Sequence, residues 1–198
     1  MNYLAHAYLS FYEPEITVGN VISDFVKGKK KFDFSPGIQN GITLHRAIDE
    51  FTDNHEATLS AKQFFRPDYR LYSTAFIDIV YDHFLANDPN EFAGPDALFT
   101  FSQVTYRVLE GYESVFPVGF MMMFPFMQQH NWLYNYRLAE GIRKSFGGLV
   151  RRARYLQNAE PAFRVFEENY EVLKQCYTHF FPSLKHFAAQ QLELLKTP

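Results

Sequence analysis

The chain has 198 residues, a length typical of one domain, and 47% of them are hydrophobic. Its 19 basic and 22 acidic residues give a formal net charge of −3, which excludes an overall positive field that would attract nucleic acid or an anionic membrane. The single cysteine, Cys176, excludes an internal disulfide framework and a cysteine-rich metal site.

The N-terminal segment lacks a basic stretch followed by an apolar one, so we expect no secretory signal. No apolar run approaches the ~20 residues that a membrane-spanning helix needs. The closest run, residues 115–127, contains Pro117 and Pro125. We therefore expect a cytoplasmic protein with neither a membrane nor a nucleic acid as partner.

Helical signals dominate the chain, and period-two alternation typical of strands is not sustained. Ser35 and Pro36 predict a helix start, with serine as N-cap and proline in the first turn, and this helix extends to about His55. Further helices are expected at residues 2–11, 17–27, 56–65, 70–86, 96–115, 132–155 (broken near Gly147 and Gly148) and 161–196 (interrupted by Pro182). The sequence thus predicts an all-α, compact, single-domain helical bundle over residues 1–198.

The helix at residues 36–55 carries polar side chains on its apolar face. Helical periodicity places His45 and Asp49 in the middle of that face, with Asp53 at its edge. Burying an unpaired aspartate is costly, so its charge requires a partner. A divalent cation held by His45 and Asp49 is one explanation. A buried His–Asp pair that bridges helices is the alternative.

The helix at residues 70–86 is apolar around most of its circumference, yet it contains Asp78 and Asp82 one turn apart, followed by His83. Two carboxylates in a dry environment repel each other unless a cation or a proton lies between them. If the partner is a cation, the two aspartates form part of a metal site, and this is the interpretation that the sequence favours. Alternatively, Asp78 accepts a hydrogen bond from a helix end or from a tyrosine hydroxyl.

For two further polar residues, His6 and Asp24, the sequence gives weaker support for a place in the site. His6 lies on a stripe with Asn2 and Ser10, either at a solvent edge or on a polar seam that faces the site. Periodicity places Asp24 opposite apolar neighbours and favours a solvated carboxylate.

Histidine and carboxylate ligands without thiolate suit Mn²⁺, Mg²⁺, Fe²⁺ or Zn²⁺. Such a cation activates water and polarises a phosphoryl oxygen, and Arg46 beside His45 is placed to stabilise phosphate charge. Basic residues at 27–31 and 151–154 form local positive patches that fit an acidic protein partner.

Several segments resemble a known family, the bacterial acyl carrier protein phosphodiesterases. They are NYLAH at 2–6, GNVISDFVKG at 19–28, GITLHRAID at 41–49, FTDNH at 51–55, DIVYDHFL at 78–85, NWL at 131–133 and GLVRR at 148–152. The resemblance implies a helical fold related to the HD-domain phosphohydrolases. It also implies Mn²⁺-favoured hydrolysis of 4′-phosphopantetheine from a serine of holo-acyl carrier protein.

The resemblance extends the candidate site to residues that periodicity alone does not single out. The residues expected to bind metal are His6, Asp24, His45, Asp49, Asp78 and Asp82. Catalytic roles are expected for His45, Arg46, Asp49 and His83, while Asp53 also lies in a matching segment. The order Asp82-His83 reverses the His-Asp order of ordinary HD domains, so ligand assignments from those domains do not transfer.

Two other functions fit the same residues. One is a metal-dependent phosphohydrolase of a small phosphoester or nucleotide. The other is a non-enzymatic helical module that binds the acyl carrier protein, with the His/Asp cluster purely structural.

Overall fold

The computed structural model describes residues 1–197, and all regular elements within that range are helical, which confirms the predicted all-α class. The α-helices are α1 (Tyr3–Tyr8), α2 (Pro14–Ile22), α3 (Pro36–Asn54), α4 (Glu56–Tyr69), α5 (Ser73–Ala86), α6 (Pro95–Glu110), α7 (Val118–Gln129), α8 (Trp132–Asn135), α9 (Ala139–Arg152), α10 (Glu160–Glu168) and α11 (Tyr170–Lys196). Four short 3₁₀ helices lie between them, η1 (Ser23–Phe25), η2 (Gly28–Asp33), η3 (Arg70–Tyr72) and η4 (Glu113–Val115).

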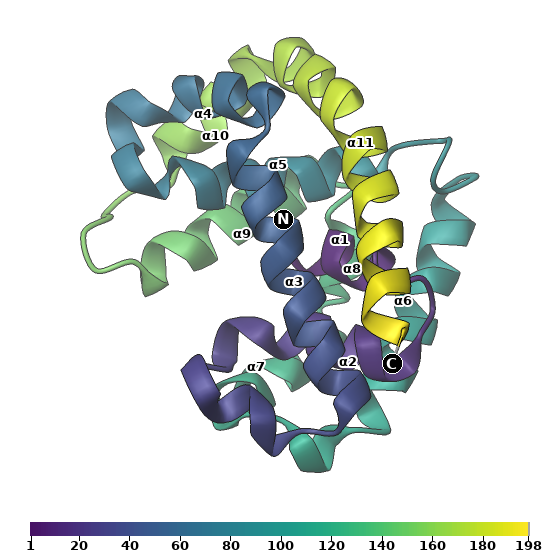
Figure 1. Cartoon of the computed structure of the whole chain (residues 1–198). Coiled ribbons are helices and arrows are strands. Elements are labelled where there is room, and N and C mark those ends of the chain that lie inside the picture. The colour runs from purple at the N-terminus through teal and green to yellow at the C-terminus, as the bar shows by residue number, and fades with distance from the viewer. Residues whose placement is uncertain (198) are drawn as a thin grey trace.

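Helix α3 is the central element of the fold. Pro36 occupies its first turn, and the helix ends one residue before His55, as the sequence predicts. Figure 1 shows α3 passing through the middle of the molecule, with α11 alongside it and α2 against its N-terminal half.

Helices α2 and α3 approach each other closely at two glycines. A Cβ atom on Gly19 would lie 2.1 Å from the main-chain oxygen of Ile38, and one on Gly41 would lie 2.4 Å from that of Ile16. Only residues without a side chain allow the two backbones to come this near. This crossing sets the position of the following turn of α3, which carries His45.

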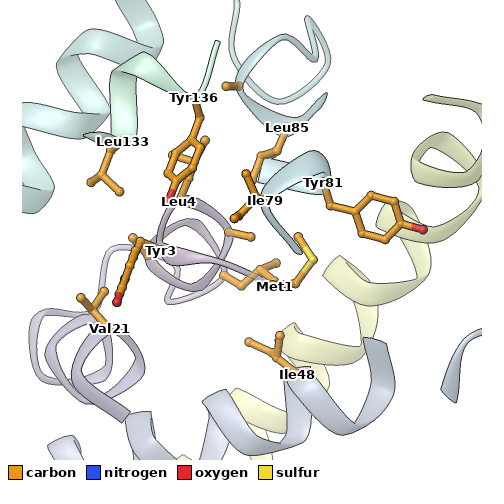
Figure 2. Packing of buried hydrophobic residues seen from close by; sticks show 14 of the residues in the cluster. Met1, Tyr3, Leu4, Val21, Ile48, Ile79, Tyr81, Leu85, Leu133 and Tyr136 are labelled. Carbon is orange, nitrogen blue, oxygen red and sulfur yellow. The ribbon is translucent and has the colours of Figure 1, made fainter. Parts of the chain in front are cut away.

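Helix α1 is short and lies in the core. Met1, Tyr3 and Leu4 are surrounded by apolar side chains from several other helices, as Figure 2 shows. Those labelled are Val21 from α2, Ile48 from α3, Ile79, Tyr81 and Leu85 from α5, Leu133 from α8, and Tyr136. The start of the chain is therefore packed between helices that lie far apart in the sequence.

Three details of the predicted helices were wrong. Residues 118–129 form α7, a helix that is missing from those expected from the sequence. Gly147 and Gly148 lie inside α9, where buried Ile142 and Phe146 hold the helix against the core, and the break falls at residues 136–138 instead.

Likewise, Pro182 lies within the continuous helix α11, and the expected interruption is absent. The neighbouring Phe180, Phe181 and Leu184 are buried, so packing compensates for the hydrogen bond that proline removes. The break in this region falls earlier, at Asn169 between α10 and α11.

Among residues 1–197, no helix combines the length and apolar composition required to cross a membrane.

Candidate metal centre

Two histidines and one aspartate converge between α1 and α3. Nε2 of His6 lies 3.2 Å from Oδ1 of Asp49, and Nε2 of His45 lies 3.1 Å from its Oδ2. The two imidazole rings are stacked, with centroids 3.9 Å apart. One ligand atom from each residue lies within 4.8 Å of the others, a spacing that suits a single metal ion.

One buried residue, Asn20 on α2, orients both imidazoles. Its side-chain Nδ2 donates to the carbonyl oxygen of His6 at 2.8 Å, so its Oδ1 is free to accept from Nδ1 of His6, also at 2.8 Å. Its main-chain oxygen accepts from Nδ1 of His45 at 2.7 Å. Both Nδ1 atoms therefore carry hydrogen, and both Nε2 atoms point toward Asp49. Such outer contacts are what fixes a metal-ligating histidine in its tautomer.

The buried Nε2 of His6 has no hydrogen-bond partner, despite its 3.2 Å separation from Asp49. With hydrogen on Nδ1, this nitrogen presents a lone pair to a carboxylate oxygen, and two acceptors face each other. A cation between them removes this mismatch. The His–His–Asp cluster is thus compatible with a divalent metal.

The pKa values of the two histidines are shifted in opposite directions. Burial, and then the neighbouring His45, lower the pKa of His6 to about 4. Burial also opposes the charged form of His45, but hydrogen bonds with Asp24 and Asp49 prevail and raise its pKa to about 9. Although burial opposes the ionised carboxylate, the histidines and the α-ammonium of Met1 hold the pKa of Asp49 well below its usual value.

Asp24 lies at the solvent-exposed side of the cluster. Oδ1 of Asp24 is 3.3 Å from Nε2 of His45, while 64% of the Asp24 side chain is exposed. The carboxylate is therefore solvated, as periodicity favours, and also adjacent to the centre. Arg46 is exposed and donates to the main-chain oxygen of Val26 at 3.2 Å. Asp49 is itself 41% exposed, so ions and solvent have access to the cluster.

Asp78 lies beside the cluster and pairs with the start of the chain. The buried α-amino group of Met1 is 3.0 Å from Oδ1 of Asp78 and 3.4 Å from Oδ1 of Asp49. Burial opposes the charge of this ammonium, yet Asp78 and Asp49 raise its pKa to about 11. The ammonium thus supplies a positive charge beside Asp78, where the sequence predicts a metal ion or a hydrogen-bond donor.

Asp82 accepts hydrogen bonds from the N-terminal end of helix α1. Its fully buried carboxylate accepts from the main-chain N–H groups of Asn2, Leu4 and Ala5, at 3.3, 2.8 and 3.2 Å. These are donors at the start of α1 that have no partner within the helix. Burial raises the pKa of Asp82 to about 7, against the opposing effect of the ammonium and the N–H donors. The sequence suggests a helix end as a partner for Asp78. In the structure it is Asp82 that binds a helix end, the N-terminus of α1.

His83 and Asp53 lie outside the cluster. Nδ1 of His83 donates to the main-chain oxygen of Tyr136 at 2.7 Å, and its Nε2 is 3.2 Å from the hydroxyl of Tyr170. Asp53 pairs with Lys62 at 2.7 Å. The structure therefore brings together His6, Asp24, His45 and Asp49, with Asp78 linked to Asp49 through the α-amino group of Met1. Arg46 follows His45 in the sequence, but its guanidinium contacts Val26.

Sequence reasoning missed two contributors, Asn20 and the α-amino group of Met1. Asn20 is a polar residue among apolar neighbours of α2 and is completely buried, a pattern that was visible in the sequence but has many structural explanations. No side-chain pattern points to the main-chain amine.

The fold and the centre define an all-helical protein whose His–His–Asp site combines two buried histidines with a partly exposed aspartate and is compatible with a divalent cation. The family model for acyl carrier protein phosphodiesterase matches residues 1–184, so the chain belongs to this family. Membership confirms the resemblance and the expected enzyme class, a hydrolase of phosphodiester bonds.

Curated relatives match over nearly their whole length. The acyl carrier protein phosphodiesterase of Salmonella paratyphi A is 27% identical over 191 residues, 96% of this chain and 99% of the relative. That of Klebsiella pneumoniae subsp. pneumoniae is 27% identical over 188 residues, 95% and 97% of the two chains. That of Photorhabdus laumondii is 28% identical over 182 residues, 92% of each. The chain matches no solved structure.

Proposed function

We propose that this protein is a metal-dependent phosphodiesterase that removes 4′-phosphopantetheine from the serine of holo-acyl carrier protein. The observation that carries the proposal is the convergence of two imidazole Nε2 atoms on the carboxylate of Asp49, at 3.1 and 3.2 Å. The name shared by the family and its relatives supplies the substrate.

His6, His45 and Asp49 would hold the cation, with Asp24 as a fourth ligand. Asp78 and Asp82 have other partners, the α-ammonium of Met1 and the first turn of α1, so the proposed ligand set leaves them out. Nitrogen and carboxylate ligands suit Mn²⁺, which we favour, and also Mg²⁺, Fe²⁺ and Zn²⁺. When bound, the cation would supply Lewis-acid polarisation of a phosphoryl oxygen.

In the proposed reaction, water attacks phosphorus and the bond from phosphorus to the serine oxygen breaks. One proton of the water passes to the serine oxygen, which gives apo-carrier protein and 4′-phosphopantetheine. We assign to Arg46, which follows His45 in the sequence and is exposed, the role of pairing with the phosphate oxygens. His83 is engaged with Tyr136 and Tyr170 and has no part in this scheme.

An acidic carrier protein would dock on a local basic surface. Arg151 and Arg152 are exposed at the end of α9, and Lys27, Lys29 and Lys30 are exposed around η2. Both groups attract an acidic partner, even though the whole chain has a formal charge of −3.

Incubation of the purified protein with holo-acyl carrier protein and Mn²⁺ tests the proposal. Mass spectrometry should show conversion to the apo form, together with free 4′-phosphopantetheine, and a chelator should stop the reaction. Absence of product with each of the four cations would refute the proposed activity. Turnover of nucleotides or small phosphoesters without any carrier protein would instead favour the small-molecule phosphohydrolase.

Two matched variants separate the centre from a general loss of structure. His45→Ala should lose both bound metal and activity. His179→Ala, an exposed histidine on α11 that pairs with Glu56 at 3.2 Å, should retain both. If His45→Ala folds and keeps its metal and activity, the proposed ligand set is wrong.

A further inference from the structure

A cavity of about 770 Å³ lies between the start of α1 and helices α7, α8 and α9. This volume falls within the range of pockets that enclose small ligands. Its lining includes the aromatic residues Phe126, Trp132 and Tyr136 and the amide-bearing residues Asn2, Gln129, Asn131 and Asn135.

None of the candidate metal ligands lines the cavity, but residues close to them on α1 and α5 do. Asn2 and Tyr3 line the cavity, whereas His6 lies one turn further along α1. On α5, Ile79 lines the cavity and the preceding Asp78 contacts the ammonium that also reaches Asp49. A ligand in the cavity could therefore extend to the centre along the first turn of α1.

The pKa of Tyr3 is influenced by charged residues of both the centre and the cavity. Burial and the charge of Asp24 raise the pKa of its hydroxyl, while the charge of Arg152 lowers it. Asp24 belongs to the centre and Arg152 to the lining of the cavity, so the Tyr3 hydroxyl responds to one charge from each.

The lining suits a ligand that carries amides and a negative charge. Oδ1 of Asn131 is buried without a hydrogen-bond partner, and a ligand N–H group would satisfy it. Asn131 also has a left-handed backbone, with φ of 42°. The lining is also basic. It contains one acidic residue, Glu140, and three positively charged residues, Lys144, Arg151 and Arg152.

We propose that this cavity binds the pantetheine arm of the substrate, with its amide groups against the asparagines and its phosphate at the end next to His6 and Asp49. This inference rests on the proposed function and adds the location of the arm. Arg151 and Arg152 at the rim would then face the acidic carrier, because the carrier is attached to the same phosphate.

Two adjacent glycines provide a matched pair of variants. Gly148 lines the cavity and Gly147 does not, although both lie in α9. A Cβ on Gly148 would meet no atom closer than 3.8 Å, and one on Gly147 none closer than 3.9 Å, so both sites have space for a side chain. Leucine is also a better helix former than glycine. Gly148→Leu should partly fill the cavity, and Gly147→Leu should leave it open.

We expect Gly148→Leu to lower kcat/KM for holo-carrier protein by about tenfold or more relative to Gly147→Leu. The affinity for Mn²⁺ should be equal in the two variants, which shows that the centre is intact. Equal kcat/KM values in the two variants would overturn the location of the arm.

Binding without catalysis gives an independent measurement, because Trp132 is the only tryptophan of the chain and lines the cavity. Titration of the protein with 4′-phosphopantetheine should change its fluorescence saturably in the wild type and Gly147→Leu, and weakly in Gly148→Leu. No saturable change in the wild type would overturn the arm site, even if holo-carrier is hydrolysed. Failure to release product with any cation would instead refute the proposed function.

Discussion

Nδ1 of His45 lies 2.7 Å from the main-chain oxygen of Asn20, and the side chain of the same asparagine holds His6. A single residue of α2 thus sets the tautomer of two imidazoles from two other helices. The close contact of Gly19 with Gly41 makes this possible, since it brings the α2 backbone within hydrogen-bonding distance of α3.

Replacing Asn20 should weaken metal binding without removing any proposed ligand. In Asn20→Leu, Nδ1 of His6 loses its acceptor, and we expect the affinity for Mn²⁺ to fall by about 10- to 100-fold. Loss of these buried hydrogen bonds should also lower the free energy of unfolding by about 1–3 kcal/mol. Titration calorimetry and urea denaturation measure the two effects.

Asn40→Leu is the matched control, because Asn40 donates from α3 to the main-chain oxygen of Leu195, away from the centre. It should lose stability but retain its affinity for Mn²⁺. Equal affinities in the two variants would show that Asn20 has no positioning role.

The glycine crossing should be intolerant of side chains. In Gly41→Ala the new methyl group would lie 2.4 Å from the main-chain oxygen of Ile16, so α2 and α3 must separate. We expect a loss of about 1–3 kcal/mol in the free energy of unfolding, measured by urea denaturation, together with weaker Mn²⁺ binding. Gly147→Ala, in open space within α9, should instead gain about 0.5–1 kcal/mol. A wild-type stability for Gly41→Ala would contradict the close contact.

Metal binding should release a proton. His45 has a pKa of about 9, so at neutral pH the metal-free protein carries a proton there, shared with Asp24 and Asp49. A metal ligand must be neutral imidazole, so the apparent affinity should rise about tenfold per pH unit and level off above the pKa of His45. His6 contributes no proton in this range, because its pKa is about 4.

Calorimetric titration with Mn²⁺ in two buffers of different ionisation enthalpy measures the number of protons released. We expect close to one at neutral pH. A value of zero, or an affinity that rises as the pH falls, would exclude a protonated His45 in the metal-free centre.

Removal of Asp82 should affect mainly the stability of the fold, whereas removal of Asp49 should affect mainly metal binding. Asp82→Ala leaves the main-chain N–H groups of Asn2, Leu4 and Ala5 without an acceptor, and we expect it to lower the free energy of unfolding by at least about 1–3 kcal/mol. Wherever the variant folds, its affinity for metal should stay closer to the wild-type value than that of Asp49→Ala. Parallel denaturation and metal titrations check both points, and a complete loss of metal in folded Asp82→Ala would restore Asp82 as a ligand.

Helical periodicity predicted the inward position of His45 and Asp49 because one face of α3 is strongly apolar. It could not identify the neighbour that each buried carboxylate meets. The partner of Asp82 is the first turn of α1 and that of Asp78 is a main-chain amine, and neither has a side-chain signature. The placement of helix breaks failed for a similar reason. Gly147, Gly148 and Pro182 disfavour a helix locally, but packing of their buried neighbours outweighs that preference.

Helix α1 has six residues, far fewer than the ~12–15 at which an isolated helix becomes even marginally stable in water. Its helical state depends on the carboxylate of Asp82 and on the surrounding core. An ion that joins His6 to α3 would therefore restrain the opening of the first eight residues. Slower amide hydrogen exchange in that segment would then report the occupancy of the centre, without any substrate.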